Sequence, residues 1–306
     1  MSEKMNPMDI FNMDVKDINL FNEDKKESVL YNPKADQGKD GVYRALIRFV
    51  PNIKNPNKPI ERKFVYWLED ADGNSAYYDS PTTVSEKCPV QDMFFKLRNS
   101  ESAIDKKNAE KLKRREIFYS VIQVIKDPQD EKQEGKLRIF KYGWKIKQKI
   151  DEEMKPQFDE PTQIFDPFEG KNFELTITKQ GGFNNYDSSK FQGRKSPMLI
   201  DGEMVKDDQN GRMKVIEYLK DSPDLSVFEY KPWDDETRAK IYSILELYKS
   251  PGKAIGSITG KANMSYEDID LPTSSNVPSA NVDFSEVDET SEQNDLKGFL
   301  ADLDLA

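Results

Sequence analysis

Residues 84–91, which read VSEKCPVQ, place a potential metal ligand in a spacing that is typical of metal sites. Cys88 is followed by Pro89 and Val90, so a second cysteine at the next position would complete a C-x-x-C zinc knuckle. That position is Gln91, Cys88 is the only cysteine of the chain, and the chain has no histidine. The residues alone leave two interpretations open: Cys88 is a small buried side chain, or it is the remnant of a metal site.

The absence of histidine also limits the catalytic mechanisms that the chain could use. Histidine is the commonest general base and metal ligand, so hydrolase mechanisms that depend on it are excluded. The 56 acidic residues form no spacing typical of a catalytic pair. The sequence also holds no P-loop, G-x-S-x-G or G-x-G-x-x-G pattern. We therefore predict a protein without catalytic activity.

A different chemistry is indicated where basic and aromatic residues alternate. Residues 136–147 read KLRIFKYGWKIK, and residues 113–119 read KRREIFY. Alternate residues of a strand share a face, so Arg138, Phe140 and Tyr142 are expected on one side of it. Cations neutralise phosphates and flat rings stack on bases, which contributes roughly 1–3 kcal/mol per base in single-strand binding. The alternative is that the aromatic residues form a core and the basic residues line its rim.

Two further segments could take part in binding. Residues 181–191, GGFNNYDSSKF, can form a tight loop that presents Phe183 and Tyr186, with Lys190 close behind. The alternative there is a hairpin whose aromatic residues pack inward. Residues 295–306, DLKGFLADLDLA, alternate acidic and apolar side chains. Such an end can be a peptide ligand for partners, can compete for a basic groove, or can be a solubilising disordered tail.

The charge of the chain is unevenly distributed. The net charge of −10 falls within residues 264–306, which hold eleven acidic residues and one basic residue, whereas the other 263 residues hold 45 of each sign. Residues 106–149 carry fourteen basic and six acidic residues, a local excess of +8. A basic segment in a neutral body, beside an acidic tail, points to a polyanionic partner. A solvated charged face is the alternative.

Composition and periodicity indicate the class of fold. With 36% hydrophobic and 33% charged residues, the chain has no apolar run of about 18 residues that could cross a membrane, and one cysteine fits a reducing compartment. An Asp-Gly turn at 70–74 predicts a hairpin. Short strands around a helical segment predict an α+β fold with a barrel-like β domain. Strands are expected at 42–50, 62–69, 75–80, 116–128, 136–144 and 171–180, and helices at 89–115, 145–154 and 234–249.

Three stretches resemble the replicative single-stranded DNA-binding proteins of T4-type bacteriophages. They are GVYRALIRFVPN, KRREIFYSVIQVIKDPQDEKQEGKLRIFKYGWKI and DPFEGKNFELTITKQGGFNNYDSSKF, and the similarity covers about residues 38–195. The resemblance implies an OB-fold-like β-barrel core with an inserted helical subdomain, flanked by an N-terminal arm and a disordered acidic C-terminal tail. We expect the arm at 1–35, the core at 36–263 and the tail at 264–306.

The resemblance also implies a function, namely sequence-nonspecific binding of single-stranded DNA in a basic, aromatic cleft. The chain would coat single strands during phage DNA replication, recombination and repair in the cytoplasm of the infected bacterial host, without contact to a membrane. Its acidic tail would recruit replication and recombination proteins and compete with DNA for the cleft. The family's basic N-terminal motif for self-association along the strand is not visible in MSEKMNPMDIF. Cooperative coating is therefore expected to be weaker or to use apolar contacts.

The resemblance and the alternating patterns together give candidate residues. Phosphate contacts are expected from Arg48, Lys113, Arg114, Arg115, Arg138, Lys141 and Lys190. Base stacking is expected from Phe118, Phe140, Tyr142, Phe183 and Tyr186. Partner contacts in the tail are expected from Asp295, Phe299, Leu300, Asp302 and Asp304. Phe118 and Phe140 stand where the family has tyrosines, and a phenyl ring keeps the stacking face.

This chain departs from the family's pattern at the zinc site. The family uses one histidine and three cysteines, but here Cys88 remains, Gln91 replaces its neighbour and Pro81 stands near another lost ligand. Tetrahedral zinc needs about four such ligands, so we expect no zinc and no other cofactor. Apolar contacts should then hold residues 75–100. The expected contacts are Tyr77, Val84, Val90, Met93 and Phe94.

Two other functions stay open at this point, and a nuclease that binds Mg²⁺ with a carboxylate cluster is a distant third. A phage structural or scaffolding protein could carry a basic stretch that meets nucleic acid incidentally. An RNA-binding OB-fold protein would need the same stacking and phosphate contacts, because neither of them requires DNA.

Overall fold

The computed structural model describes residues 28–250, and all structural statements below concern these residues. The chain divides between Asp270 and Leu271, and the described residues all belong to the first unit. Of the predicted arm, only residues 28–35 fall within this range. The predicted tail at 264–306, with its five candidate partner residues, lies outside it.

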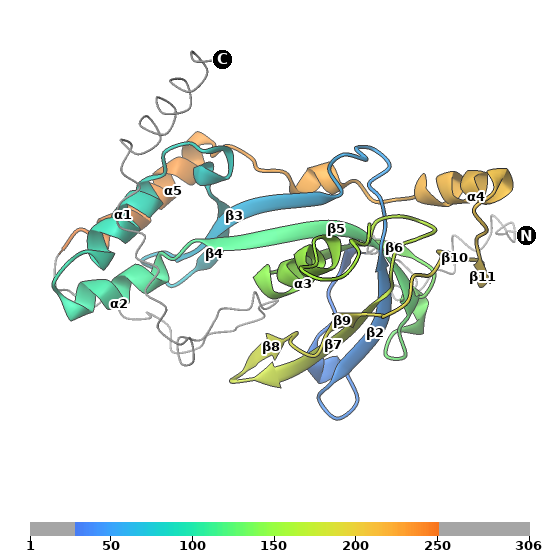
Figure 1. The fold of residues 1–306 in the computed structure, drawn as a ribbon. Helices are drawn as coiled ribbons and strands as arrows, with labels where there is room; N and C mark the ends of the chain where they lie inside the picture. The colour runs from blue at the N-terminus through green and yellow to red at the C-terminus, as the bar shows by residue number, and fades with distance from the viewer. Residues whose placement is uncertain (1–27, 251–306) are drawn as a thin grey trace, which may run out of the picture. The chain divides into compact units, whose positions relative to one another are not determined.

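One large sheet forms the framework of the described residues (Figure 1). Its strand order is β1-β6-β5-β2-β7-β8, with β3 paired to β5, β4 to β3, and β9 to β7. All of these pairs are antiparallel except β1 with β6. The strands are β1 (Leu30–Tyr31), β2 (Tyr43–Phe49), β3 (Ile60–Glu69), β4 (Ser75–Asp79), β5 (Arg115–Lys126), β6 (Leu137–Tyr142), β7 (Phe173–Gln180), β8 (Phe183–Asn185) and β9 (Lys190–Phe191). A separate hairpin joins β10 (Leu199–Ile200) to β11 (Glu203–Met204).

Strand β5 is central because most of its residues are apolar on both faces. Residues 117–124 are all buried. The N-terminal half of β5 pairs with β3, its C-terminal half pairs with β2, and β6 runs along its middle. A long strand with both faces covered needs apolar residues at consecutive positions, which EIFYSVIQVIK supplies.

The main core lies on one face of β2, β5, β6 and β7 and is covered by α3 (Trp144–Met154). Helix α3 buries Ile146 and Ile150, which are four residues apart and therefore on one side of the helix. Strand β1 is attached by its second residue. Tyr31 and Tyr43 donate hydrogen bonds from their hydroxyls to Asp127 Oδ2, at 2.7 and 2.5 Å. Leu30 and Tyr31 of the predicted arm are thus part of the sheet.

A helical unit is inserted between β4 and β5. It consists of α1 (Pro89–Arg98) and α2 (Ala103–Lys111), and α5 (Asp235–Glu246) packs beside α1 (Figure 1). Pro89 suits the first turn of α1 because the first amides of a helix have no internal partner. Ser102 caps α2 by accepting a hydrogen bond from the backbone N–H of Asp105. The predicted helix at 89–115 is therefore two helices that end at Lys111.

The α+β class is confirmed, as is the hairpin of β3 and β4 at the Asp-Gly turn. Asp70 holds this turn by accepting hydrogen bonds from the backbone N–H groups of Asp72 and Asn74. No pairing joins β1 to β7 or β8 within the described range, so the OB-fold barrel stays a prediction. Helix α4 (Gln209–Leu219) and strands β1, β10 and β11 had no counterpart in the predicted elements. The short 3₁₀ helices are η2 (Ala35–Gln37), η3 (Pro81–Val84), η4 (Glu131–Gln133) and η5 (Leu225–Phe228). Within 28–250, no helix has the length and apolar character needed to span a bilayer.

Candidate nucleic-acid interface

Strands β3 and β5 carry a group of charged and aromatic side chains on one face. Arg62 lies opposite Phe118, and Phe64 lies opposite Glu116. Directly paired residues share a face, so this face continues from Phe118 in the main core outward to Phe64 and Glu116. Glu116 Oε1 forms an ion pair with Arg62 Nε at 2.5 Å. Together with Arg114, which lies just before β5, the residues Arg62, Phe64 and Glu116 form what we call the Phe64 cluster.

Two guanidinium groups lie against the Phe64 ring. The Cζ atoms of Arg62 and Arg114 are 4.6 and 3.7 Å from its centroid. Arg114 Nη1 also donates a hydrogen bond of 2.7 Å to Thr82 Oγ1 in η3. Guanidinium groups stack on aromatic faces because the ring's negative face attracts the cation. A half-buried ring between two arginines matches the residue types that single-stranded nucleic acid recognises.

A second aromatic group lies on the hairpin of β3 and β4. The rings of Trp67 and Tyr77 have centroids 4.6 Å apart. Lys141 Nζ, from β6, lies 5.1 Å from the centroid of the Tyr77 ring. Tyr77 is 37% exposed. These three residues, called the Trp67 cluster, repeat the combination of ring and cation.

Helix α3 and the loop between β8 and β9 add further aromatic and basic residues. Trp144, at the start of α3, and Phe183, on β8, are both exposed. Gly181 and Gly182 take φ values of 60° and 87°, which allows the tight turn that leaves Phe183 exposed. Tyr186, by contrast, packs partly against the main core. Phe183 therefore has a free face for stacking, whereas Tyr186 offers only part of its ring.

Asp187 ties this loop to α3. Its Oδ1 lies 2.8 Å from Lys145 Nζ, and Lys149 Nζ donates to the Asp187 backbone carbonyl at 3.1 Å. The Lys145 ammonium and the Asn185 amide hold the pKa of Asp187 below its usual range. The two lysines therefore position the loop that follows β8, the strand that carries Phe183.

Three candidate stacking residues lie in the core. Phe118 and Phe140 are each 2% exposed and Tyr142 is 4% exposed. Their rings stack on one another, and the Tyr142 hydroxyl lies 2.9 Å from Ser120 Oγ. This corrects the expectation that these rings are open to bases. The alternation along β6 correctly predicted that Phe140 and Tyr142 share a face. That face is covered by the rest of the core and by α3.

Arg48 is also buried and cannot meet a phosphate from this position. Its side chain is fully buried. Nη1 donates to Ser196 O at 2.6 Å and to Asn172 Oδ1 at 3.1 Å, and Nη2 donates to Asp166 O at 2.7 Å. Burial lowers the pKa of Arg48 to about 10. The expectation of a phosphate contact is corrected here, because Arg48 holds two distant segments against β2.

The other basic candidates lie nearer the surface but do not form one group. Lys113 Nζ is 3.6 Å from Glu110 Oε2, and Arg115 is half-buried at the start of β5. Arg138 is half-buried and donates from Nε to Gln133 Oε1 at 2.9 Å. The structure thus brings Arg114 and Lys141 against aromatic rings and leaves the remaining basic candidates apart from them.

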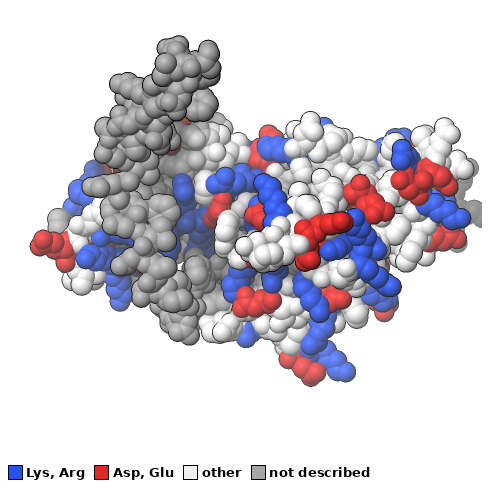
Figure 2. Space-filling view, in the orientation of Figure 1, with Lys and Arg blue, Asp and Glu red and all other residues white. Residues whose placement is uncertain are grey.

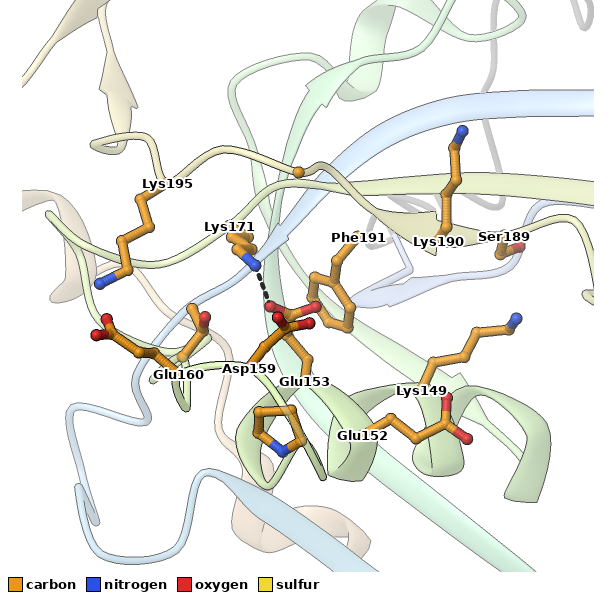
Figure 3. A pocket seen from close by; sticks show the side chains of 13 residues that line it. Lys149, Glu152, Glu153, Asp159, Glu160, Lys171, Ser189, Lys190, Phe191 and Lys195 are labelled. Atoms are coloured by element: carbon orange, nitrogen blue, oxygen red, sulfur yellow. Dashed lines mark hydrogen bonds and ion pairs between the residues drawn. The ribbon is translucent and has the colours of Figure 1, made fainter.

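Lys190 lines a pocket of about 660 Å³ between α3 and β9 (Figure 3). Four lysines and four carboxylates line it: Lys149, Lys171, Lys190, Lys195, Glu152, Glu153, Asp159 and Glu160. Lys171 is paired with Glu153, as the dashed line in Figure 3 shows. A pocket with balanced charge does not favour a polyanion. The face drawn in Figure 2 likewise shows Lys and Arg side chains interspersed with Asp and Glu side chains.

Sequence reasoning missed four residues of the interface: Arg62, Phe64, Trp67 and Tyr77. The signal was present in the sequence, because ERKFVYW in β3 mixes basic and aromatic residues as 136–147 does. This segment was interpreted only as a strand, because the cations that contact its hairpin's rings, Arg114 and Lys141, come from other elements.

Cys88 is a buried residue of the helical unit. It is 2% exposed and packs among apolar residues of β3, α1 and α5. Gln91 Oε1 accepts a hydrogen bond of 2.9 Å from the Tyr66 hydroxyl. No group of three or more metal-binding side chains occurs within residues 28–250. The residues present do not fit the family's zinc site.

Three of the five expected contacts in this region are confirmed. Val90 and Phe94 are buried there and Met93 packs against them, but Tyr77 and Val84 are 37% and 49% exposed. The core also draws on β3, on α1 and on segments further along the chain: Tyr66, Leu68, Leu97, Leu112, Ile241, Ile244, Leu245 and Tyr248.

Known DNA-binding proteins are similar to this chain in sequence. Residues 39–228 match the model of a family described as gp32 DNA binding protein like. Two curated proteins, named single-stranded DNA-binding proteins of Enterobacteria phages T4 and T2, are each 30% identical over 192 residues, which is 59% of this chain and 59% of each relative. The match thus spans about three fifths of the relatives' length. Because the family model covers more than half of the sequence, this chain belongs to the family of gp32-like DNA-binding proteins and not to a family of enzymes.

Proposed function

We propose that this chain binds single-stranded DNA without sequence preference. The observation that carries the proposal is that cations from other elements lie against half-buried or exposed rings at two places on the hairpin of β3 and β4. These are Arg114 on Phe64 and Lys141 on Tyr77. Flat rings accept any base, and cations follow the phosphates, so the combination favours a single strand over a defined sequence. The family match supports the same partner.

The biological setting is proposed by analogy with the phage relatives. The chain would coat single strands during DNA replication, recombination and repair in the cytoplasm of an infected bacterium. The acidic residues 264–306 would recruit replication proteins and compete with DNA for the cations of the Phe64 and Trp67 clusters. Their net charge of −10 supports this role.

A salt titration tests the proposal. Binding of the full chain to poly(dT), followed by intrinsic fluorescence, should weaken as salt rises by about 0.7 log units per log unit of salt for each phosphate neutralised. A variant with Lys113→Ala and Arg114→Ala should bind all sequences more weakly and lower this slope. Lys240→Ala, which removes an exposed cation from α5, is the matched control. Unchanged affinity in the double variant would contradict the proposed interface.

Two comparisons separate the rival functions. A structural or scaffolding protein would not coat single strands stoichiometrically and in proportion to their length, whereas a strand-coating protein would. An RNA-binding protein would prefer single-stranded RNA over DNA of matched length and sequence. Equal affinity for RNA and DNA would agree with the stacking interface but would extend the proposed partner to any single-stranded nucleic acid.

A further inference from the structure

The Phe64 cluster holds a ring whose two cations are not equivalent. Arg62 is neutralised by Glu116 at 2.5 Å. Arg114 forms no ion pair with any residue in 28–250, and its hydrogen-bond acceptor is the neutral hydroxyl of Thr82. A phosphate would compete with Glu116 for Arg62 but has no carboxylate to displace at Arg114. Arg114 is therefore the cation that an incoming strand would recruit first.

The ring itself is held on rigid backbone. Phe64 pairs with Glu116 of β5 on one side. On its other side, its backbone N–H donates to Thr83 Oγ1 at 2.9 Å, and its carbonyl accepts from the backbone N–H of Ser80 at 2.8 Å. A platform fixed at both edges loses little freedom when a ligand stacks on it. Arg114, by contrast, is a long side chain that can move without breaking the sheet.

We propose that Phe64 is a base-stacking platform that Arg114 covers in the unbound protein. On binding, a phosphate draws Arg114 off the ring and a nucleobase takes its place. This inference rests on the proposed function and deepens it, because it names the residue that reads a base. A guanidinium on a half-buried ring is worth roughly 2- to 30-fold in an equilibrium. A stacked base is worth roughly 5- to 150-fold, so the exchange favours the base.

The experiment separates base stacking from phosphate binding. Wild type and the variants Phe64→Leu and Arg114→Ala are titrated with oligo(dT) and with an abasic oligonucleotide of the same length, which has phosphates but no bases. Phe64→Leu should weaken oligo(dT) binding by roughly 5- to 150-fold and leave abasic binding within about 2-fold. Arg114→Ala should weaken both. Phe158→Leu, the same change at a 91% exposed ring, is the control.

Each other outcome overturns a defined part of this scheme. If Phe64→Leu leaves oligo(dT) binding unchanged, or weakens both ligands equally, Phe64 is not a stacking platform. If the wild type binds no oligo(dT), the proposed function itself fails. Phe64→Trp guards against a misfolded leucine variant, because it keeps a ring at this position. Its added indole fluorescence, compared with that of wild type, should be quenched by oligo(dT) and not by the abasic strand, and equal quenching would overturn the proposal.

Discussion

The Tyr66 hydroxyl donates a hydrogen bond to Gln91 Oε1 at 2.9 Å, across the space between β3 and α1. Gln91 occupies the position at which a C-x-x-C knuckle would place its second thiolate. Cys88 beside it is surrounded by apolar residues. A hydrogen bond between neutral side chains and an apolar core thus occupy the region where the sequence pattern suggested the remnant of a zinc knuckle.

Zinc removal should therefore have no effect on this protein. We expect metal analysis of the purified full chain to find no stoichiometric zinc, and the melting temperature to be the same with and without a chelator, because no ligand set is available. A fall in melting temperature on chelation would contradict this expectation.

The hydrogen bond itself should be measurable in a double-mutant cycle. Tyr66→Phe removes the hydroxyl and Gln91→Ala removes the acceptor, and each should lower the free energy of unfolding. The coupling between them should be about 0.5–1.5 kcal/mol, the usual range for one such bond. Urea denaturation of the four proteins gives the value. A coupling near zero would show that the two side chains do not depend on each other.

Much of the fold could be predicted from local patterns. Strands β2, β3, β4, β5, β6 and β7 and helices α3 and α5 follow from β-branched runs, an Asp-Gly turn and an acidic helix start. Helix α4 was missed because its buried residues, Gly211, Val215 and Leu219, are only three among polar neighbours. Strand β1 has two residues and depends on the edge of β6 for its existence. Such elements are defined by tertiary contact and have no local signal.

The site was harder to predict, because exposure depends on distant segments. Alternation in β6 correctly placed Phe140 and Tyr142 on one face, but only the packing of α3 and β2 shows that this face is buried. Arg48 looks like an exposed base in a strand, and its cover comes from residues more than a hundred positions away. Phe64 became a candidate only when Arg114 was found against its ring.

Deleting residues 264–306 should tighten DNA binding. The deletion removes eleven acidic residues and one basic residue, so the remaining chain has equal numbers of each sign. If the tail competes for the cations of the Phe64 and Trp67 clusters, affinity for poly(dT) should rise, and the rise should shrink at high salt because screening weakens the competition. Weaker binding after the deletion would contradict the competition model. Comparison with double-stranded DNA checks that the gain is specific to single strands.

The protein should lose stability in alkaline solution. Burial raises the pKa values of Tyr31, Tyr43 and Tyr142, and raises the pKa of Tyr248 to about 12. These groups stay protonated when folded but ionise near pH 10 when unfolded. Their contribution is therefore complete below about pH 10 and is lost as the pH rises toward the folded pKa values.

Urea midpoints between pH 8 and pH 12 measure this loss. Each such tyrosine should steepen the fall by up to about 1.4 kcal/mol per pH unit. Tyr142→Phe should make the fall less steep by one group, whereas Tyr242→Phe, at an exposed position, should not. An equal effect of the two substitutions would show that burial is not the cause.

Arg48→Met should destabilise the fold without a specific loss of DNA binding. The substitution leaves the Ser196 carbonyl and the Asn172 Oδ1 atom without the guanidinium donor, and leaves the Asp166 carbonyl with only the Gly170 N–H, which should lower the free energy of unfolding by about 3 kcal/mol. Arg44→Met, at an exposed position of the same strand, should cost less than about 0.5 kcal/mol. Urea denaturation measures both. At a temperature where Arg48→Met remains folded, its affinity for poly(dT) should stay close to that of wild type. A variant that keeps the stability of wild type but binds poly(dT) weakly would contradict this expectation. Arg48 would then contribute to DNA binding and not to the stability of the fold.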